Sequence, residues 1–510
     1  MTAGTENPIV RTTVGALRGT RENRICVFRG IPYAAPPIGI LRFKPPHPTP
    51  VWDGARDATV DGPVAPQLPS RLAHVMGNFD RPQSEDCLTL NVWTPQPVTG
   101  GALRPVMVWI HGGAFLSGAG SLPWYAGDRF AQDGVVAVSI NYRLGPLGFL
   151  CLPGVSEANL GFQDQIAALR WVHDNIAAFG GDPKNVTVVG QSAGASSIAA
   201  HILSPQSRGL FQRAIMQSTP FGRGSRSLEE AHRIGRRFLE VLGLRQSEAE
   251  GVAQIPVERL LQATGQLARL EKKLADVSPP FSLVIDGRVI PREIMPTLEG
   301  GWSAEVDLMI GTTREEMTAF FASDPAVRNA DAAAVASVFA AILGPGYRTQ
   351  YDELHRMRAS DASASVLGDL MSDHVFRLGS LQLAECQELH GRAAYVYEFD
   401  WQSPAGFEAC HCLELPFVFA NLANWSGAPM LRGADAREMD GLAHAMHGAW
   451  NAFIQSGDPN HADLPHWVPY RQLDRITMRF DRVIGPVRDL AGLEWRQPWP
   501  RLPGADPVAS

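Results

Sequence analysis

The feature that most constrains this chain is a serine between two glycines, at the junction of an apolar run and a helix-forming run. Residues 190–194 read Gly-Gln-Ser-Ala-Gly, directly after the apolar segment 186–189 and directly before the alanine-rich segment 193–200. The pattern predicts a strand, a sharp turn and a helix, with the backbone of Ser192 strained and its hydroxyl exposed at the apex. Glycine suits positions 190 and 194 because a Cβ there would collide where strand and helix pass. The alternative, an ordinary surface-loop serine, does not account for this context.

Short apolar runs typical of buried strands recur along the chain, with helical patterns between most of them. They lie at residues 89–93, 106–110, 135–140, 186–189, 214–217, 306–310 and 394–399. Their alternation predicts the α/β class, with a large, mostly parallel central sheet and helices on both faces. In such folds the functional groups collect at the carboxyl ends of the strands. The clearest helical pattern spans 162–179 and ends at two glycines.

The rest of the chain gives no sign of a domain boundary. The first hundred residues are rich in proline and glycine and predict an antiparallel lead-in with long loops. We find no internal repeat, low-complexity tract or linker-like charge run. We therefore expect a single domain over residues 1–510, with helical insertions at roughly 220–390.

Charge and cysteine content exclude several classes of function. A net charge of −7 gives no electrostatic footprint for nucleic acid, and no apolar stretch approaches membrane-spanning length. The six cysteines lack CxxC spacing, which argues against a zinc site and favours buried, reduced thiols. We expect a cytoplasmic monomer or homodimer that acts on a small molecule, with no nucleic-acid or membrane partner and no metal or organic cofactor.

A serine hydroxyl attacks a carbonyl only with help from a neutral imidazole and a carboxylate that orients it. In this fold the nucleophile, the acid and the base follow in that chain order. Glu316 follows the expected strand 306–310, and His411 follows the expected strand 394–399. Both positions suit these roles.

Spacing alone leaves competitors open. Glu315 is adjacent to Glu316, and Glu414 and His447 are further candidates. His447 lies in a helical pattern over 442–454, which favours a packing role.

The chemistry also needs amide groups that stabilise the oxyanion of a tetrahedral intermediate. Ala193 offers one amide from the first turn of the expected helix. The expected strand 106–110 leads into the small residues of 111–115, His-Gly-Gly-Ala-Phe, which let the backbone approach a ligand. A glycine pair after a strand can also be a plain turn, but its pairing with a downstream serine turn favours the functional interpretation.

At this point the sequence resembles a family, the type-B carboxylesterases of the cholinesterase-like branch of the α/β-hydrolase fold. The matching motifs lie at 28–34, 84–92, 111–115, 141–149, 178–183, 190–194, 311–314 and 411–417. Within that family the sequence is similar to the bacterial para-nitrobenzyl esterases and to the phenmedipham (aryl carbamate) hydrolases. The resemblance covers nearly the whole chain.

The resemblance implies Ser192 as nucleophile, Glu316 as orienting acid and His411 as general base. It also implies an oxyanion hole, formed by the amides of Gly113, Ala114 and Ala193. Two ion pairs are implied as well, Arg42 with Glu85 and Arg143 with Asp164.

The chain departs from the family at several positions. Gln191 stands where many members have glutamate, so attraction for cationic alcohols should be weaker. Ala65 removes a family disulfide partner of Cys87, and no tryptophan lies in the loop 68–85. Met317 replaces the glycine that usually follows the acid. Because of Gln191 and the absence of a tryptophan in the loop 68–85, choline esters are poor candidate substrates.

These residues predict two-step acyl transfer through a covalent acyl-enzyme, acting on carboxylic esters of small aromatic or alkyl alcohols. Phe115, Trp124 and Phe281 are expected to form an apolar, aromatic pocket. An aryl carbamate hydrolase would use the same triad and remains an alternative. A catalytically silent interaction module would show a broken triad, and an interfacial lipase would show an apolar lid; neither feature is visible.

Overall fold

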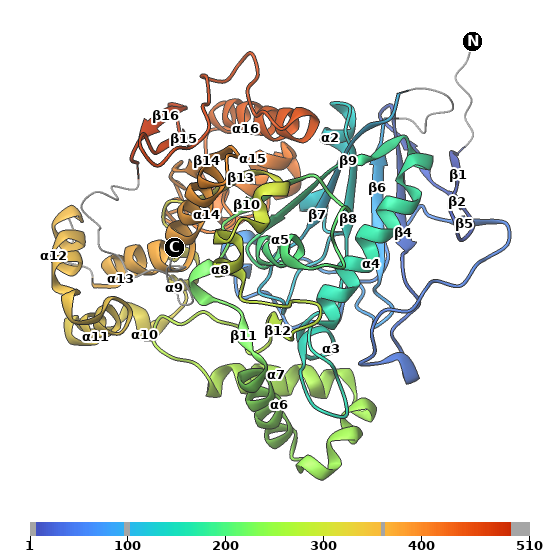
Figure 1. Cartoon of the computed structure of the whole chain (residues 1–510), viewed down its shortest axis with the longest axis horizontal. Coiled ribbons are helices and arrows are strands. Elements are labelled where there is room, and N and C mark those ends of the chain that lie inside the picture. Colours follow the sequence, from blue (N-terminus) through green and yellow to red (C-terminus); the bar gives the residue numbers. More distant parts are fainter. Residues whose placement is uncertain (1–6, 96–101, 359–362, 491–510) are drawn as a thin grey trace.

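The computed structural model describes residues 7–95, 102–358 and 363–490, and it is built around one large twisted sheet (Figure 1). Its strands are β3 (Thr20–Glu22), β4 (Ile25–Pro32), β6 (Thr89–Thr94), β7 (Arg104–Ile110), β8 (Val136–Ile140), β9 (Gly181–Gln191), β10 (Arg213–Gln217), β13 (Asp307–Thr313), β14 (Ala394–Phe399), β15 (Ile476–Phe480) and β16 (Gly485–Arg488). The spatial order is β16-β15-β14-β13-β10-β9-β7-β8-β6-β4-β3. Every neighbouring pair from β8 to β15 is parallel, and the pairs at both edges are antiparallel. The predicted α/β class is confirmed.

Each apolar run predicted as a strand lies within one of the central strands, with small differences at the ends. The carboxyl-terminal strands β15 and β16 were not predicted. Both are short and mix polar with apolar residues, as in the sequence Ile-Thr-Met-Arg-Phe of β15, so they lack an apolar run. The antiparallel lead-in has the expected character. Three further strands of this region form a small separate sheet: β1 (Ile9–Arg11), β2 (Ala16–Arg18) and β5 (Ala55–Asp57).

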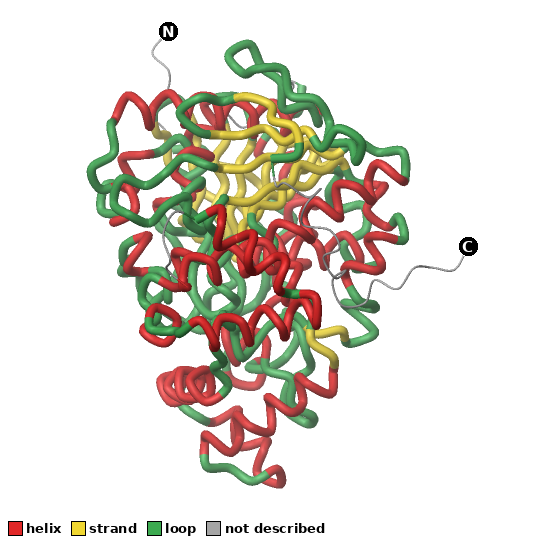
Figure 2. Tube along the Cα trace, turned by 90° about the vertical axis from the view of Figure 1, so that its left-hand side faces the viewer, coloured by secondary structure: helices red, strands yellow, loops and turns green. Residues whose placement is uncertain are grey.

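Helices cover both faces of the sheet, and alternate residues of each strand point to opposite faces. On β7, Val106, Val108 and Ile110 belong to one core, whereas Met107 and Trp109 belong to the other. The first core is closed by α4 (Leu160–Asn175), α5 (Ala193–Leu203) and α14 (Leu378–Leu389), and the second by α2 (Asp128–Gln132), α15 (Leu415–Phe419) and α16 (Ala436–Ser456). Figure 2 shows the strands as one band with helices around it.

The helix predicted over 162–179 corresponds to α4 and a following 3-10 turn, Ile176–Phe179. It ends at Gly180, whose φ of 86° is readily adopted by glycine. The apolar spacing read from the sequence is therefore the buried face of this helix.

The segment between β10 and β14 is mostly helical. It contains α6 (Leu228–Leu242), α7 (Val257–Leu270), α8 (Ile294–Glu299), α9 (Thr318–Phe321), α10 (Pro325–Arg328), α11 (Ala332–Leu343), α12 (Arg348–Met357), α13 (Ser363–Ser372) and α14, together with β13. In Figure 1 α6 and α7 lie at the bottom of the view and α10 to α13 at its left, whereas α8 and α14 lie near the middle. No helix in the described part of the chain is long and apolar enough to cross a membrane.

Candidate active site

Ser192 occupies the turn between β9 and α5, as the sequence predicts. Its φ of 56° and ψ of −119° lie outside the regions favoured by residues with a side chain, so the turn is strained. A Cβ at position 194 would approach Ile110 O to 2.0 Å, and one at position 190 would approach Gly194 C to 2.8 Å. The two glycines therefore allow β7, β9 and α5 to meet at this point.

His411 and Glu316 reach the same edge of the sheet from segments that follow β14 and β13. The Nδ1 atom of His411 is hydrogen-bonded to Oε2 of Glu316, and both residues are buried. The other carboxylate oxygen of Glu316 accepts a hydrogen bond from Thr313 N at 2.9 Å. The imidazole lies between the rings of Phe320 and Phe376, each with its centroid 5.1 Å away. This arrangement fixes both the position of the ring and its tautomer.

The second nitrogen of His411 does not bond to Ser192 in this structure. Instead, His411 Nε2 accepts a hydrogen bond from the side-chain amide of Gln191 at 3.0 Å. Among the described residues, no hydrogen bond joins the Ser192 hydroxyl to His411. All three side chains line one small cavity. The imidazole lone pair is therefore held by a residue adjacent to the serine, and the amide must release it before the serine can use it.

The expected oxyanion loop also lies beside the serine. The φ angles of Gly113, Ala114 and Phe115 are 112°, 57° and 59°, an unusual run of positive values. Within the described ranges, the amides of Gly113 and Ala114 donate to no backbone or side-chain acceptor. Ala193 lies in the first turn of α5, where helix amides have no intrahelical partner. Ala114 lines both cavities that contain Ser192, whereas Gly113 lines only the smaller and Ala193 only the larger.

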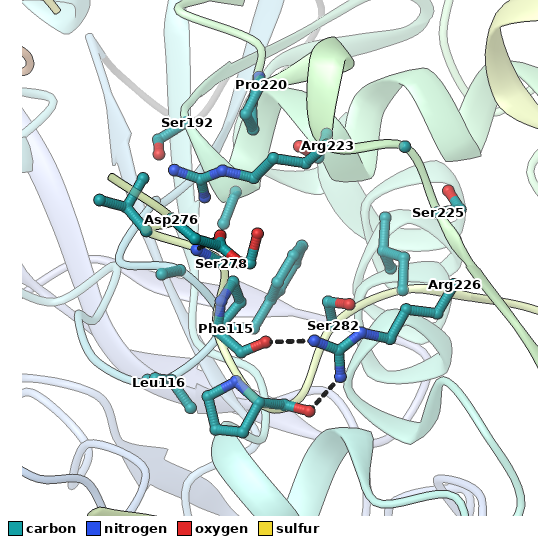
Figure 3. Close-up of a pocket in the computed structure, with 18 of the residues that line it drawn as sticks. Phe115, Leu116, Ser192, Pro220, Arg223, Ser225, Arg226, Asp276, Ser278 and Ser282 are labelled. Carbon is teal, nitrogen blue, oxygen red and sulfur yellow. Dashed lines mark hydrogen bonds between the residues drawn. The ribbon is translucent and has the colours of Figure 1, made fainter. Parts of the chain in front are cut away.

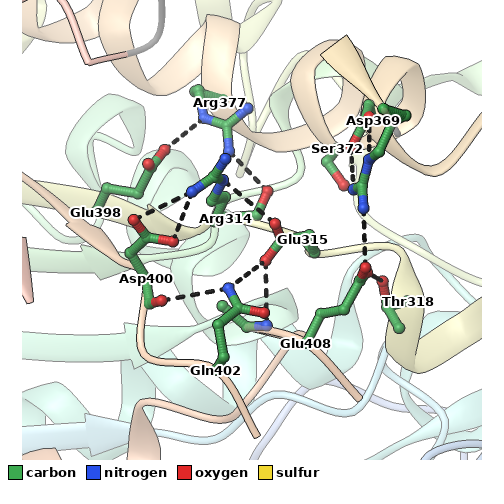
Figure 4. Close-up of polar contacts among 12 residues, drawn as sticks. Arg314, Glu315, Thr318, Asp369, Ser372, Arg377, Glu398, Asp400, Gln402 and Glu408 are labelled. Atoms are coloured by element: carbon green, nitrogen blue, oxygen red, sulfur yellow. Dashed lines mark hydrogen bonds and ion pairs between the residues drawn. The ribbon is translucent and has the colours of Figure 1, made fainter. Parts of the chain in front are cut away.

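A network of paired charges holds the loop that carries Glu316 (Figure 4). Arg314 bonds to Asp400 at 3.0 Å, and its carbonyl oxygen accepts from Arg377 at 2.7 Å. Arg377 in turn pairs with Glu398 at 2.8 Å and with Asp373. Because each guanidinium meets carboxylates, the charges are compensated within the protein.

The network also separates the two adjacent glutamates. Glu315 pairs with Arg314 at 3.2 Å and accepts hydrogen bonds from Gln402 and from Ala409 N, both at 3.1 Å. Burial raises the pKa of Glu315, while Gln402 and Arg314 oppose the rise. Glu315 therefore points into the supporting network, and Glu316 alone meets the histidine.

The other competitors have different surroundings. His447, on α16, bonds to Val418 O at 2.8 Å and to Asp133 at 3.0 Å, and it lines neither of the two cavities that contain Ser192. Glu414 lies behind the site and accepts from Gln217 at 3.1 Å. Burial and the nearby Glu316 charge raise the pKa of Glu414 to about 8. Neither residue bonds to Ser192 or His411 among the described contacts.

Two cavities that share wall residues open on Ser192. The larger measures about 720 Å³ and the smaller about 50 Å³. Phe115 lines the larger cavity and Trp124 the smaller. Phe281, expected in the pocket, lies instead in the core: it is 2% exposed, packs edge-on against Phe238 and does not line either cavity. Its apolar side chain is drawn into the packing between the cavity wall and α6.

Part of the cavity wall is charged, and the sequence patterns do not predict it. Arg71 and Arg223 line both cavities together with Ser192. Both arginines come from irregular segments, one between β5 and α1 (Ala73–Met76) and one at the end of a short 3-10 turn after β10. No motif or periodicity marks such positions in a sequence.

The two ion pairs implied by the resemblance are present. Arg143 holds Asp164 through two hydrogen bonds of 2.8 and 2.6 Å, both side chains being almost fully buried. Arg42 holds Glu85 at 2.6 and 2.7 Å. None of the six cysteines forms a disulfide and all six are buried, and the described residues contain no group of three His, Cys, Asp or Glu side chains arranged to hold a metal ion.

Comparison with known proteins agrees with this geometry. A family model described as "Carboxylesterase family" matches residues 6–485. The chain belongs to the carboxylesterase family. It is a carboxylic-ester hydrolase of the α/β-hydrolase fold, as the sequence predicts.

Individual relatives are similar over nearly their whole length. Phenmedipham hydrolase from Pseudarthrobacter oxydans is 41% identical over 493 residues, covering 95% of this chain and 97% of that protein. Para-nitrobenzyl esterase from Bacillus subtilis is 39% identical over 484 residues, covering 93% and 95%. The crystal structure of a Geobacillus stearothermophilus carboxylesterase superposes with a TM-score of 0.86 at 37% identity, covering 96% of this chain and all of that one.

Proposed function

We propose that Ser192, His411 and Glu316 form the catalytic triad of this esterase, and that esters of small aromatic or alkyl alcohols are its substrates. The observation that carries the proposal is the buried His411–Glu316 pair, whose histidine lines the same cavity as Ser192. An imidazole that donates to a carboxylate through Nδ1 keeps Nε2 as an acceptor, which is the form a general base needs.

In the first step the Gln191 amide yields the Nε2 lone pair, and His411 takes the proton from the Ser192 hydroxyl. The Ser192 oxygen attacks the ester carbonyl, and the oxyanion accepts hydrogen bonds from the amides of Gly113, Ala114 and Ala193. The imidazolium then protonates the departing alcohol. Water repeats the sequence on the acyl-enzyme and releases the acid.

The proposed pocket has Phe115 and Trp124 on its walls, and Phe281 is no longer part of it. Trp124 stacks on Trp425 with ring centroids 4.9 Å apart, which gives the smaller cavity a rigid aromatic side. Aromatic walls favour flat apolar alcohols such as phenols.

Carbamate hydrolysis is the second candidate, favoured by the 41% identity to a protein named phenmedipham hydrolase. It would use the same residues and differ in the shape of the pocket. Matched phenyl acetates and phenyl N-methylcarbamates, assayed side by side, decide which class has the higher kcat/KM.

The test of the triad is labelling with a fluorophosphonate followed by mass spectrometry of the modified peptide. We expect the label on Ser192. The Ser192→Ala variant should take up no label, and its kcat should fall by a factor of about 10⁶. A label on another residue would overturn the proposal.

The further expectations are also proposals. The whole chain acts as one catalytic domain with the helical segment between β10 and β14 as its insertion. A core that continues from the sheet into α6, α7, α8 and α14 supports this, while α10 to α13 pack around a hydrophobic cluster of their own. Six cysteines without a disulfide support a reducing, cytoplasmic setting, and a monomer or homodimer remains the expected assembly. A small-molecule ester fits the cavity, and the net charge of −7 supports no nucleic-acid partner.

A further inference from the structure

Two arginines stand on the wall between the cavities that open on Ser192. Arg71 and Arg223 line both the larger and the smaller cavity. Figure 3 shows the Arg223 guanidinium extending across the larger cavity toward Ser192. A group bound between these arginines would lie next to the serine hydroxyl.

Neither arginine forms an ion pair within the described protein, although the charge of Asp276 acts on both. Among the described residues, no carboxylate lies within ion-pair distance of either guanidinium, whereas Arg233, further along the same cavity, meets Glu271 at 2.9 Å. The Nη2 atom of Arg223 is buried without a hydrogen-bond partner. Arg71 donates to Val277 O at 2.9 Å, a neutral acceptor. Buried donors are normally satisfied, so an unsatisfied nitrogen on a guanidinium that extends across a cavity points to a missing anionic acceptor.

Aromatic rings hold the two charges in place without cancelling them. Arg223 lies over Phe376 at 5.8 Å from the ring centroid, and Arg71 lies over Phe320 at 5.9 Å. These are the two rings that flank His411. The arginines are therefore fixed relative to the proposed catalytic histidine, which is the preorganisation that a binding subsite needs.

The electrostatics around Arg223 also favour a bound anion. Burial lowers the pKa of Arg223 to about 9, the Arg71 charge adds to this, and Asp276 and Glu316 oppose it. Asp276 also lines the larger cavity, but it is exposed and already accepts a hydrogen bond from Ser278 N at 2.8 Å. An added negative charge between the arginines would relieve their mutual repulsion.

We propose that Arg71 and Arg223 form an anion-binding subsite, and that the preferred substrates of this esterase carry a carboxylate within a few bonds of the scissile ester. The inference rests on the proposed triad, since it places the carboxylate relative to Ser192. Planar guanidinium groups bind carboxylates through paired hydrogen bonds, which orients the substrate as well as attracting it. Half-esters of dicarboxylic acids carry the charge on the acyl side, and acyloxybenzoates carry it on the alcohol side.

The experiment compares charged and neutral substrates of similar shape. The pairs are 4-acetoxybenzoate with methyl 4-acetoxybenzoate, and the mono-4-nitrophenyl ester of glutaric acid with 4-nitrophenyl pentanoate, after subtraction of spontaneous hydrolysis. The wild type should favour the charged member of at least one pair by about 10- to 100-fold in kcat/KM. Which pair shows the preference tells which side of the ester faces the arginines.

The variants are Arg223→Gln and Arg71→Gln, with Arg233→Gln as the matched control from the same cavity. Either subsite variant should lower the charged-to-neutral ratio by about tenfold or more, and the control should leave that ratio unchanged. Asp276→Asn should raise it, because it removes the acid that competes for the arginines. Raising the salt concentration should reduce the wild-type preference.

A wild-type ratio near one in both pairs, or an equal fall in Arg233→Gln, overturns the subsite. If Arg223→Gln does not fold, Arg71→Gln and competitive inhibition of the wild type by benzoate, measured against a neutral ester, decide the question: salt-sensitive inhibition supports the subsite and absence of inhibition contradicts it. Failure of the triad proposal would be recognised separately: if Ser192 is not the nucleophile, the Ser192→Ala variant retains hydrolysis of the neutral esters.

Discussion

Arginines on two sides of the candidate site are used in opposite ways. Behind Glu316, Arg314 and Arg377 each contact carboxylates, and every guanidinium charge is met within the protein. Across the cavity, Arg71 and Arg223 face Ser192 without a carboxylate partner in the described residues. The first side is a scaffold that holds a loop, and the second is a surface that can hold a ligand.

A partner within the protein distinguishes a structural charge from a functional one near an active site. Paired buried charges stabilise a geometry, and removal of one partner leaves the other desolvated and uncompensated. A charge that lacks an internal partner contributes little to the stability of the folded state, so its presence beside the reacting groups points to a partner from outside.

The largest effect is expected at Glu316, the carboxylate that bonds to His411. Glu316→Gln should lower kcat by about 10⁴-fold, because an amide neither fixes the tautomer of His411 nor stabilises its imidazolium. Steady-state kinetics on 4-nitrophenyl acetate measure this. Glu315→Gln is the matched control and should lose less than about tenfold, since its partners are structural. Equal losses in the two variants would show that the network, and not one carboxylate, sustains activity.

The next effect is on stability. Arg377→Met should lower the free energy of unfolding by about 3–5 kcal/mol, because Glu398 and Asp373 would be left without their shared cation. Urea titration followed by tryptophan fluorescence gives the value. A loss below about 1 kcal/mol would remove the contrast between the two sides.

Glu414 differs from the acids that pair with Arg314 and Arg377, because no ion pair joins its carboxyl to a cation in the described structure. Its pKa is raised from 4.5 to about 8, so the unfolded chain loses the proton first and stability falls as pH rises through that window. The fall should approach about 1.4 kcal/mol per pH unit. Glu414→Gln should flatten this slope, and the exposed Glu250→Gln should not. Parallel urea titrations at several pH values make the comparison, and identical slopes in wild type and Glu414→Gln would contradict it.

The smallest effect is expected on the cavity side. Arg223→Met should change the free energy of unfolding by less than about 1 kcal/mol, since no internal hydrogen bond of its side chain is lost in the described structure. The same urea titration applies. A loss as large as that of Arg377→Met would mean that Arg223 is part of the scaffold after all.

Much of this fold could be predicted because its central strands are buried on both faces. Such strands are continuous apolar runs, as in β7 and β8, and a sequence displays them directly. Strands at the edge, such as β15 and β16, carry polar residues and were not visible. Ser192, Glu316 and His411 could be proposed because motifs and chain order constrain them.

Other features of the site depend on contacts between distant segments. Gln191 and His411 are 220 residues apart in sequence, yet their side chains meet at 3.0 Å. The placement of Phe281 in the core, and of Arg71 beside Arg223, likewise follows from how loops pack. Loop segments have no periodicity that reports where their side chains point.

By itself the sequence determined the α/β class, the strained serine turn and the family, because these rest on local patterns of apolar residues and glycines. Only the tertiary structure decided which glutamate meets the histidine, which charges are compensated and which face an open cavity. The physical reason is that compensation of a charge depends on distances between groups brought together by folding, and no local pattern encodes those distances.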